Sequence, residues 1–236
     1  MIFSRSRNFI FIKTRKTAGT SLEIALSPLC GPDDVVTPIS PDDEIVRLEA
    51  TGALPRNFLA DPAGEAGYRA AIEARDEAGI RAERQRWGTR RFWSHIGAAE
   101  VRGEIGEQDW ERGFKFAFDR HPYEKAVSAA AYRARGDAGA LPAMLEEVID
   151  GGRVRNWDMY AQGERLLVDE VFRYEEIDAA RAVSGERLGI GALELPRTKH
   201  TYRPGRRPAA EVLTSNQKRR IQELCAVEFE AFGYER

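Results

Sequence analysis

The pattern that most constrains the fold is an apolar strand followed directly by a turn and a helix, and it occurs twice. The first unit starts at Phe9–Ile12, a short run of β-formers typical of a strand buried on both faces. After the turn, the apolar residues over 22–26 have the spacing of a helix. The second starts at residues 114–118 and enters a helix at Pro122, a residue that suits the first helical turn. Both units predict strands of a parallel sheet whose helices cover its faces.

The rest of the chain continues this alternation. A third β-rich segment, residues 168–174, precedes a predicted helix over residues 176–187. Further helices are expected over residues 42–50, 68–86 (with Gly79 as the weak point), 98–104, 141–149, 157–160 and 214–232. We therefore expect a single α/β domain over residues 1–236, with a central parallel sheet flanked by helices and a P-loop-like phosphate-binding turn.

The net charge and the lengths of the apolar runs limit the kinds of partner that we expect for the protein. The 236 residues carry a formal net charge of −2, so overall charge does not indicate binding to nucleic acid or to a membrane surface. No apolar run approaches the ~18 residues of a membrane span, and residues 9–12 are too short for a signal-peptide core. We expect a cytoplasmic protein without a membrane span, in which any anion site must be built locally.

The number of cysteines and the spacing of possible metal ligands argue against a disulfide scaffold and against a metal site. Cys30 and Cys225 are too few for a disulfide scaffold, so two free thiols are favoured over a single bridge. No group of ligands has zinc-like spacing, and we expect no metal.

The first turn has the chemistry of a phosphate site. A turn that opens a helix directs unpaired N–H groups and the positive end of the helix dipole at one point. Gly19 permits close approach of the backbone, Thr20 and Ser21 add hydroxyls, and Lys16 adds a mobile charge. The Walker A spacing is absent. A capped helix with a solvated Lys16 is the alternative interpretation.

The second turn adds a further candidate for anion binding. Arg120 leaves the carboxyl end of the second strand, and Ser128 lies eight residues later in the following helix. An arginine fork and a hydroxyl can together hold a phosphate. A surface arginine and an ordinary helical serine are the alternative.

Taken in order, the two turns resemble those of the sulfotransferases that use 3′-phosphoadenosine 5′-phosphosulfate (PAPS), particularly the heparan and chondroitin branch and its bacterial relatives. The family has a Lys-Thr-x-Gly/Ser-Thr-Ser turn and a later Arg-x-Pro-x-x-Arg/Lys-x-x-Ser segment. Residues 16–21 match the first, and Arg120, Pro122, Lys125 and Ser128 match the second. Residues 172–177 and 232–234 also look similar, whereas residues 28–90 match nothing in the family.

The resemblance implies a donor site and a reaction. It implies that PAPS is the co-substrate, that adenosine 3′,5′-bisphosphate is the product, and that a hydroxyl, most simply of a carbohydrate, is the acceptor. It places residues 28–90 as an acceptor-specificity insertion. The implied donor-binding residues are Lys16, Thr17, Ala18, Gly19, Thr20, Ser21, Arg120, Ser128, Thr198 and Arg203. Lys13 and Arg15 leave open which basic residue faces the donor, and the spacing to Gly19 favours Lys16.

Sulfuryl transfer needs a base for the acceptor and positive charge for the leaving group. Histidine suits the first task because its ordinary pKa lies near neutral pH. His95 resembles the histidine that many glycan sulfotransferases place between the two motifs, and we predict that it is the base and that Lys16 stabilises the leaving oxygen. His95 as a hydrogen-bonded core residue is the alternative. His121 suits a helix start, and His200 is a second candidate for contact with donor or acceptor.

Two clusters of basic residues have open roles: Arg81, Arg84, Arg86, Arg90 and Arg91, and later Arg197, Lys199, Arg203, Arg206 and Arg207. Solvated surfaces are the usual role of such runs. In the sulfotransferase interpretation the second cluster covers the donor and the first meets an anionic acceptor.

Two other classes of function remain open. An ATP- and Mg²⁺-dependent small-molecule kinase would share the phosphate-binding turn. A nucleotide- or glycan-binding protein without catalysis would bind the donor product but transfer nothing.

Overall fold

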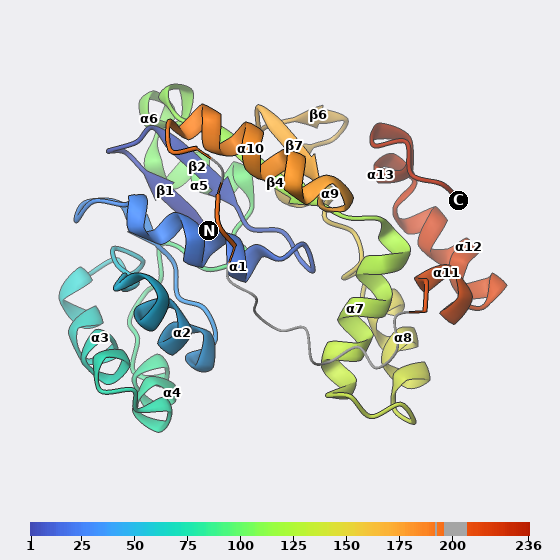
Figure 1. The fold of residues 1–236 in the computed structure, drawn as a ribbon, viewed down its shortest axis with the longest axis horizontal. Helices are drawn as coiled ribbons and strands as arrows, with labels where there is room; N and C mark the ends of the chain where they lie inside the picture. Colours follow the sequence, from blue (N-terminus) through green and yellow to red (C-terminus); the bar gives the residue numbers. More distant parts are fainter. Residues whose placement is uncertain (192, 196–206) are drawn as a thin grey trace.

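The chain is built around a five-stranded mixed sheet (Figure 1). The computed structural model describes residues 1–191, 193–195 and 207–236. In sheet order the strands are β3 (Val35–Val36), β1 (Ile2–Ser4), β2 (Phe9–Ile12), β4 (Phe114–Asp119) and β7 (Glu170–Arg173). A separate hairpin consists of β5 (Ala161–Gln162) and β6 (Arg165–Leu166). The molecule is a single-domain α/β fold with helices against the sheet.

The prediction of an all-parallel sheet is wrong at one edge. Strands β2, β4 and β7 are parallel to one another, as the strand–turn–helix units require. Strand β1 pairs antiparallel with β2, and β3 pairs antiparallel with β1. Only residues 5–8 connect β1 to β2, and a connection this short permits only an antiparallel neighbour.

The two faces of the sheet carry different side chains because strand residues alternate in direction. Phe9 and Phe11 pack on one face, with Phe116 and Phe118 from β4, under α1 (Gly19–Leu26) and α10 (Ile177–Leu188). Ile10 and Ile12 pack on the other face, under α5 (Ala98–Ile105), α6 (Glu107–Arg112) and α9 (Trp157–Tyr160). All four residues of β2 are fully buried, which confirms the prediction of a strand covered on both sides.

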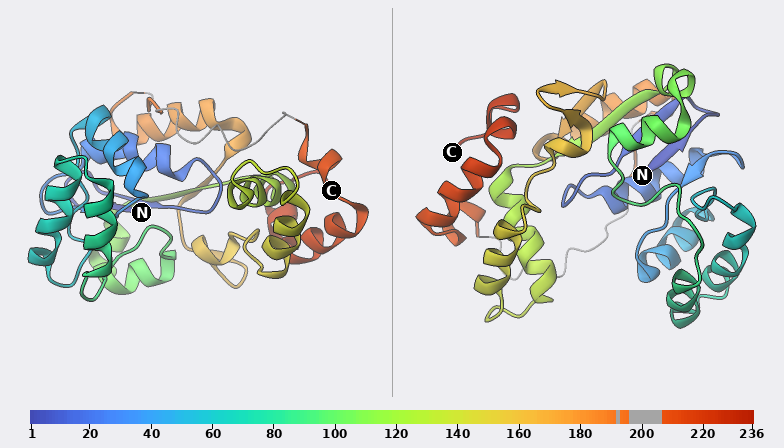
Figure 2. Two further views of the ribbon diagram at one scale, coloured as in Figure 1. Left: turned by 90° about the horizontal axis from the view of Figure 1, so that it is seen from below. Right: turned by 180° about the vertical axis from the view of Figure 1, so that it is seen from behind.

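The remaining helices form two groups that lie on opposite sides of the molecule (Figures 1 and 2). The first group is α2 (Pro41–Thr51), α3 (Ala66–Glu73) and α4 (Glu77–Gln85). The second group is α7 (Pro122–Ala134), α8 (Leu141–Asp150), α11 (Ala209–Val212), α12 (Ser215–Leu224) and α13 (Ala226–Ala231). Short 3₁₀ turns occupy Ser27–Leu29, Pro62–Glu65 and Tyr174–Glu176.

Two of the expected helices are broken in the structure. The helix predicted over residues 68–86 ends at Glu73 and resumes at Glu77, and the break lies before Gly79. Arg75 adopts a φ of +57°, and the Asp76 carboxylate accepts the backbone N–H of Gly79 as the cap of α4. The helix predicted over residues 214–232 is divided between α12 and α13 at Cys225.

Cys30 and Cys225 are free thiols, in line with the interpretation favoured from the sequence. Cys225 is buried and Cys30 is half-buried. Burial raises the pKa of Cys30 to about 12 and raises the pKa of Cys225 as well. Thiols held in the neutral form are poor nucleophiles, so both side chains act as packing groups.

We predict that Gly19→Ala destabilises the fold even without a ligand. A Cβ at this position would lie 2.6 Å from Cγ of Lys13, whose side chain is buried. Overpacking of this kind costs about 1–3 kcal/mol. Urea unfolding of the unliganded protein measures the loss.

Gly103→Ala is the matched control because Gly103 also lies in a helix but has no atom within 4 Å of the added Cβ. This variant should be unchanged or more stable by up to about 1 kcal/mol. Equal stability of Gly19→Ala and the wild type would show that Gly19 has no packing role.

Candidate anion-binding site

A cavity of about 940 Å³ lies at the carboxyl ends of β2 and β4. This end of a parallel sheet is where ligands bind in open α/β folds. The segment 13–21 forms one wall. The other lining residues are Pro38, Ile39, Ser40, Arg84, Trp93, Ser94, His95, Arg120, Ala129, Tyr132, Arg133, Val148, Arg153 and Tyr174. The cavity thus brings together the first turn, Arg120 and His95, which are far apart in the sequence.

The lining is strongly basic. Two lysines and five arginines face the cavity: Lys13, Lys16, Arg15, Arg84, Arg120, Arg133 and Arg153. None of the lining residues that the structure describes is an aspartate or a glutamate. The whole chain has a net charge of −2, so this positive field is local. A concave surface with one sign of charge concentrates ligands of the opposite sign, here oxyanions.

The turn before α1 holds an unusual backbone conformation. Lys16 and Ala18 have φ angles of +63° and +58°, which side chains with a Cβ rarely adopt. Each costs of order 1–3 kcal/mol, and such residues are concentrated at functional sites. Ala18 is the N-cap of α1 and provides no side-chain cap. The first turn of α1 therefore borders the cavity without a capping side chain, in the geometry that suits an oxyanion.

The structure separates the roles of the two lysines. The ammonium of Lys13 forms a buried ion pair with Glu23 on α1, whose carboxylate also accepts a hydrogen bond from the amino group of Met1. The ammonium of Lys16 lies 4.5 Å from the centre of the Tyr132 ring, on the cavity wall. Lys13 is therefore held as part of the core, and Lys16 is the lysine whose position suits a ligand.

The threonines of the turn also have different roles, one in the core and one at the cavity. Thr17 is fully buried, and its hydroxyl lies 2.8 Å from that of Thr14. The Thr14 hydroxyl donates to the carbonyl of Phe118, which links the turn to β4. Thr20 is only half-buried at the start of α1. The structure thus gives the Thr17 hydroxyl a contact within the turn and leaves Thr20 accessible from the cavity.

Arg120 follows β4, the strand beside β2, and lines the same cavity as the first turn. Its Nη2 atom is 3.0 Å from the Glu124 carboxylate, and its guanidinium lies 4.5 Å from the centre of the Tyr174 ring. Its Nε atom is buried and has no hydrogen-bond partner among the described residues. Ser128 is half-buried on α7 and is not among the described residues that line the cavity. The second motif therefore brings Arg120 to the cavity but not Ser128.

His121 caps the start of α7. Its Nδ1 atom accepts the N–H of Tyr123, and its Nε2 donates to the carbonyl of Glu235 at 2.9 Å. It is absent from the described lining, in agreement with the helix-start role expected from the sequence.

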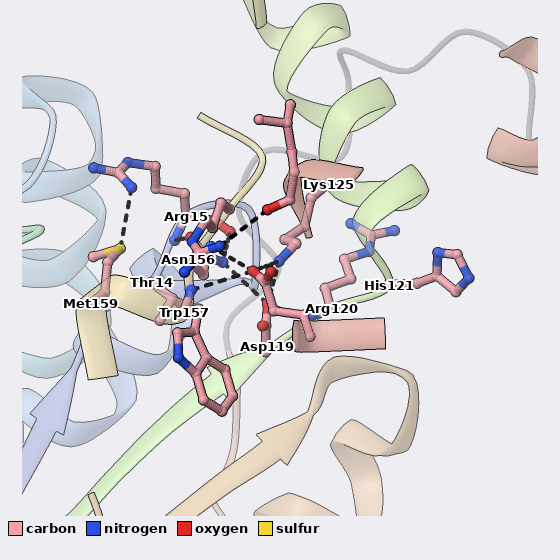
Figure 3. Close-up of polar contacts among 12 residues, drawn as sticks. Thr14, Arg15, Asp119, Arg120, His121, Lys125, Asn156, Trp157 and Met159 are labelled. Carbon is pink, nitrogen blue, oxygen red and sulfur yellow. Dashed lines mark hydrogen bonds and ion pairs between the residues drawn. The ribbon is translucent and has the colours of Figure 1, made fainter. Parts of the chain in front are cut away.

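A buried polar network joins the two turns (Figure 3). Lys125 is almost fully buried and pairs with Asp119 at 2.8 Å and with Glu228 at 3.1 Å. The Asn156 amide donates to Asp119 at 3.2 Å and to the carbonyl of Arg15 at 3.0 Å. The same amide accepts the N–H of Arg15 at 3.1 Å. The network thus fixes the distance between the first turn and Arg120, and spacing in the sequence gave no signal for it.

The charge state of Lys125 follows from this environment. Burial alone lowers the pKa of an ammonium, but the carboxylates of Asp119 and Glu228 outweigh that effect, and the pKa of Lys125 lies above its ordinary value. The lysine is therefore charged in the folded state, and its role is structural.

His95 lines the cavity, and its ring is hydrogen-bonded to the main chain. Its Nδ1 atom is 3.0 Å from the carbonyl of Lys13. A carbonyl can only accept, so Nδ1 carries the proton and Nε2 of the neutral ring has a free lone pair. The ring stays accessible from the cavity, but the surrounding protein and the charge of Lys13 lower the pKa of His95 to about 4.

The basic cluster before His95 is mostly a paired surface. Arg81, Arg86 and Arg91 form ion pairs with Glu77, Glu83 and Glu104. Arg84 alone of the cluster lines the cavity.

The candidates Thr198, His200 and Arg203, with Arg197, Lys199 and Arg206, lie outside the described residues. Arg207 is exposed and borders a second cavity, of about 410 Å³, between α7, α8 and the carboxyl-terminal helices.

Comparisons with protein-family models, with curated proteins and with solved structures find no match for this chain. Within residues 1–191, 193–195 and 207–236, no three histidine, cysteine, aspartate or glutamate side chains gather as metal ligands would. Across the same residues, none of the helices combines the length and the apolar character needed to cross a membrane. The chemistry of the site itself is therefore what indicates the function of this chain.

We predict that Lys125→Met destabilises the protein by about 3–5 kcal/mol, because it leaves the buried carboxylates of Asp119 and Glu228 without a cation. Arg219→Met is the control, because the pair of Arg219 with Glu223 is exposed and worth under about 1 kcal/mol. Urea unfolding compares the two. A loss for Lys125→Met no larger than that of the control would refute the structural role of the network.

We also predict that His95 is neutral at pH 5.5 with its proton on Nδ1. Its lowered pKa means that the unfolded chain, with an ordinary histidine pKa near 6.5, takes up the proton first. The contribution of His95 to stability is therefore full above about pH 6.5 and falls as the pH drops toward 4. Nitrogen-15 NMR of the imidazole measures both tautomer and pKa, and a ring charged at pH 5.5 would contradict the assignment.

Proposed function

We propose that this protein is a sulfotransferase that moves the sulfuryl group of PAPS to an acceptor hydroxyl, most simply that of a carbohydrate. The observation that carries the proposal is the basic cavity. It combines an uncapped helix start, an arginine and a neutral histidine in one space, and its described lining has no carboxylate. A donor with two separated phosphate groups matches cations supplied by two separate turns.

The donor is proposed to bind across the two turns. Its 5′-phosphosulfate lies at the start of α1, against Lys16 and the backbone of residues 17–21, and its 3′-phosphate lies against Arg120. The buried Nε atom of Arg120 supports this, since a phosphate oxygen would supply the missing partner. Roles for Thr198 and Arg203 remain predictions from the sequence, and Ser128 has no position that supports one.

In the proposed reaction the acceptor oxygen attacks sulfur in line with the leaving group. Its lone pair forms the new S–O bond while the bond from sulfur to the bridging oxygen breaks, and that electron pair leaves with the bisphosphate. Nε2 of His95 takes the hydroxyl proton. The ammonium of Lys16 stabilises the charge that develops on the departing oxygen. A positioned base typically contributes on the order of 10²–10⁴-fold.

The Mg²⁺-dependent kinase receives less support from the same cavity. Nucleotide kinases hold Mg²⁺ partly through an aspartate, and no carboxylate lines the described part of this cavity. No separate observation favours a binding protein without catalysis.

We predict that adenosine 3′,5′-bisphosphate binds the wild type and that Arg120→Ala weakens the binding about 10–100-fold, the effect of losing a hydrogen bond to a charged group. Calorimetric titration measures it. Arg112→Ala is the matched control, because Arg112 is exposed and lies outside the lining. Wild-type protein that ignores the bisphosphate but binds ATP with Mg²⁺ would refute the proposal in favour of the kinase.

His95→Gln separates catalysis from binding. The variant should bind the bisphosphate as the wild type does, while transfer of labelled sulfuryl from PAPS to a panel of hydroxyl acceptors should fall at least about 100-fold. Tight binding of the bisphosphate with no transfer by the wild type to any acceptor would favour a binding protein.

A further inference from the structure

Among the described residues, two arginines of the cavity form neither an ion pair with a carboxylate nor a side-chain hydrogen bond to an oxygen. Arg15 lies at the end of the strand that leads into the first turn, and Arg153 follows α8. The closest polar contact of the Arg15 side chain is the Sδ atom of Met159, 3.4 Å from Nη1. In the described part of the chain, neither arginine forms an ion pair with an aspartate or a glutamate, although both line the cavity.

The other three arginines of the cavity have structural partners. Arg133 pairs with Glu147 at 2.5 Å, and Arg120 pairs with Glu124. Arg84 donates to the carbonyl of Ile39 at 3.0 Å and lies 5.3 Å from the ring centre of Trp87. Arg15 and Arg153 thus differ from the rest of the set.

The two unbalanced charges also act on each other. Burial lowers the pKa of Arg15, and the charge of Arg153 lowers it further. Two like charges held near each other raise the free energy of the folded protein, and an oxyanion between them would remove that cost. Guanidinium groups are suited to carboxylate, sulfate and phosphate because their N–H groups match the spacing of the oxygens.

This pair lies away from the proposed donor contacts. In Figure 3 the Arg15 side chain extends toward Met159, whereas that of Arg120 extends in the opposite direction. His95 contacts the carbonyl of Lys13, two residues before Arg15. A Cβ added at Gly97, two residues after His95, would lie 3.7 Å from the carbonyl oxygen of Met159. The Arg15 side chain is therefore on the same side of the cavity as the proposed base.

The backbone holds both arginines in place. The Asn156 amide bonds both the N–H and the carbonyl of Arg15. Arg153 follows a turn in which Gly152 has a φ of +62°, and its N–H donates to the carbonyl of Val148 at 3.3 Å. Because the main chain is already fixed at both arginines, less free energy is lost in ordering the site when a ligand binds.

We propose that Arg15 and Arg153 form a second oxyanion subsite beside His95, and that the acceptor carries a carboxylate, sulfate or phosphate group near the hydroxyl that is sulfated. The acceptor role rests on the proposed function. The subsite holds the anionic group of the acceptor while the hydroxyl faces Nε2 of His95.

The experiment uses protein saturated with adenosine 3′,5′-bisphosphate and three probes titrated by calorimetry: glucuronate, glucose 6-phosphate and neutral glucose. The variants are Arg15→Gln and Arg153→Gln, with Arg90→Gln as control, because Arg90 is exposed and outside the lining. At least one anionic probe should bind ten-fold or more tightly than glucose. Each variant should weaken that binding about ten-fold or more, the control should not, and the bisphosphate affinity should stay within about twofold.

The two anionic probes distinguish a carboxylate from a phosphate preference. Thermal unfolding provides the check on folding: Arg153→Gln should melt at or above the wild-type temperature, because it removes a repulsion from Arg15. A lower melting temperature would show that Arg153 has a structural partner and would overturn the inference.

Three other results would overturn it. The variants could bind the anionic probe as the wild type does, glucose could bind equally well, or the bisphosphate could displace the probe, which would place the probe in the donor site. Failure of the wild type to bind bisphosphate is a separate result that refutes the proposed function. The same probes on unliganded protein then decide whether Arg15 and Arg153 hold an oxyanion.

Discussion

The geometry of the cavity depends on one buried carboxylate, that of Asp119. It ends β4, accepts a hydrogen bond from Tyr160 and an ion pair from Lys125, and contacts the amide of Asn156. Because Asn156 also holds the backbone of Arg15, Asp119 determines how far the first turn lies from Arg120. A charge removed from water is tolerated only when it is fully paired, so this network has little freedom to rearrange. The network therefore holds the first turn and Arg120, the two proposed contacts of the donor, at a fixed separation.

The network also shows that residue type alone does not identify a ligand-binding cation. Lys13 lies just before the first motif and Lys125 lies within the second, yet each pairs with buried carboxylates and contributes to the core. Arg15 and Arg153 belong to the same basic set and line the cavity, but in the described part of the chain neither forms an ion pair with an aspartate or a glutamate. What separates the two kinds is a buried acidic partner that the fold brings close. This is a property of the fold, and no spacing rule contains it.

Much of the fold could be predicted because local signals were strong. The buried strand at Phe9–Ile12, the second strand before Arg120 and the meeting of the two turns all follow from apolar periodicity and the geometry of parallel strands. The antiparallel edge could not, because β1 and β3 have three and two residues and show no pattern. The break at Arg75 depends on a backbone conformation that its side chain does not favour. Asn156 escaped detection because it lies 37 residues from Asp119.

The walls of the cavity come from segments that are far apart in the sequence but share one hydrophobic core. Residues 38–40 and Arg84 belong to the segment that contains α2 to α4, whose own interior includes the contacting rings of Phe58, Tyr68 and Trp87. The first turn and Arg120, on another part of the lining, are held by the Asp119 network. Because Phe58 and Tyr68 pack in the same core cluster as Ile12, a change in the interior of the first segment also reaches the strand that leads into the first turn. Natural selection can therefore vary this wall most freely at the side chains that face the cavity, and its interior is constrained together with the sheet.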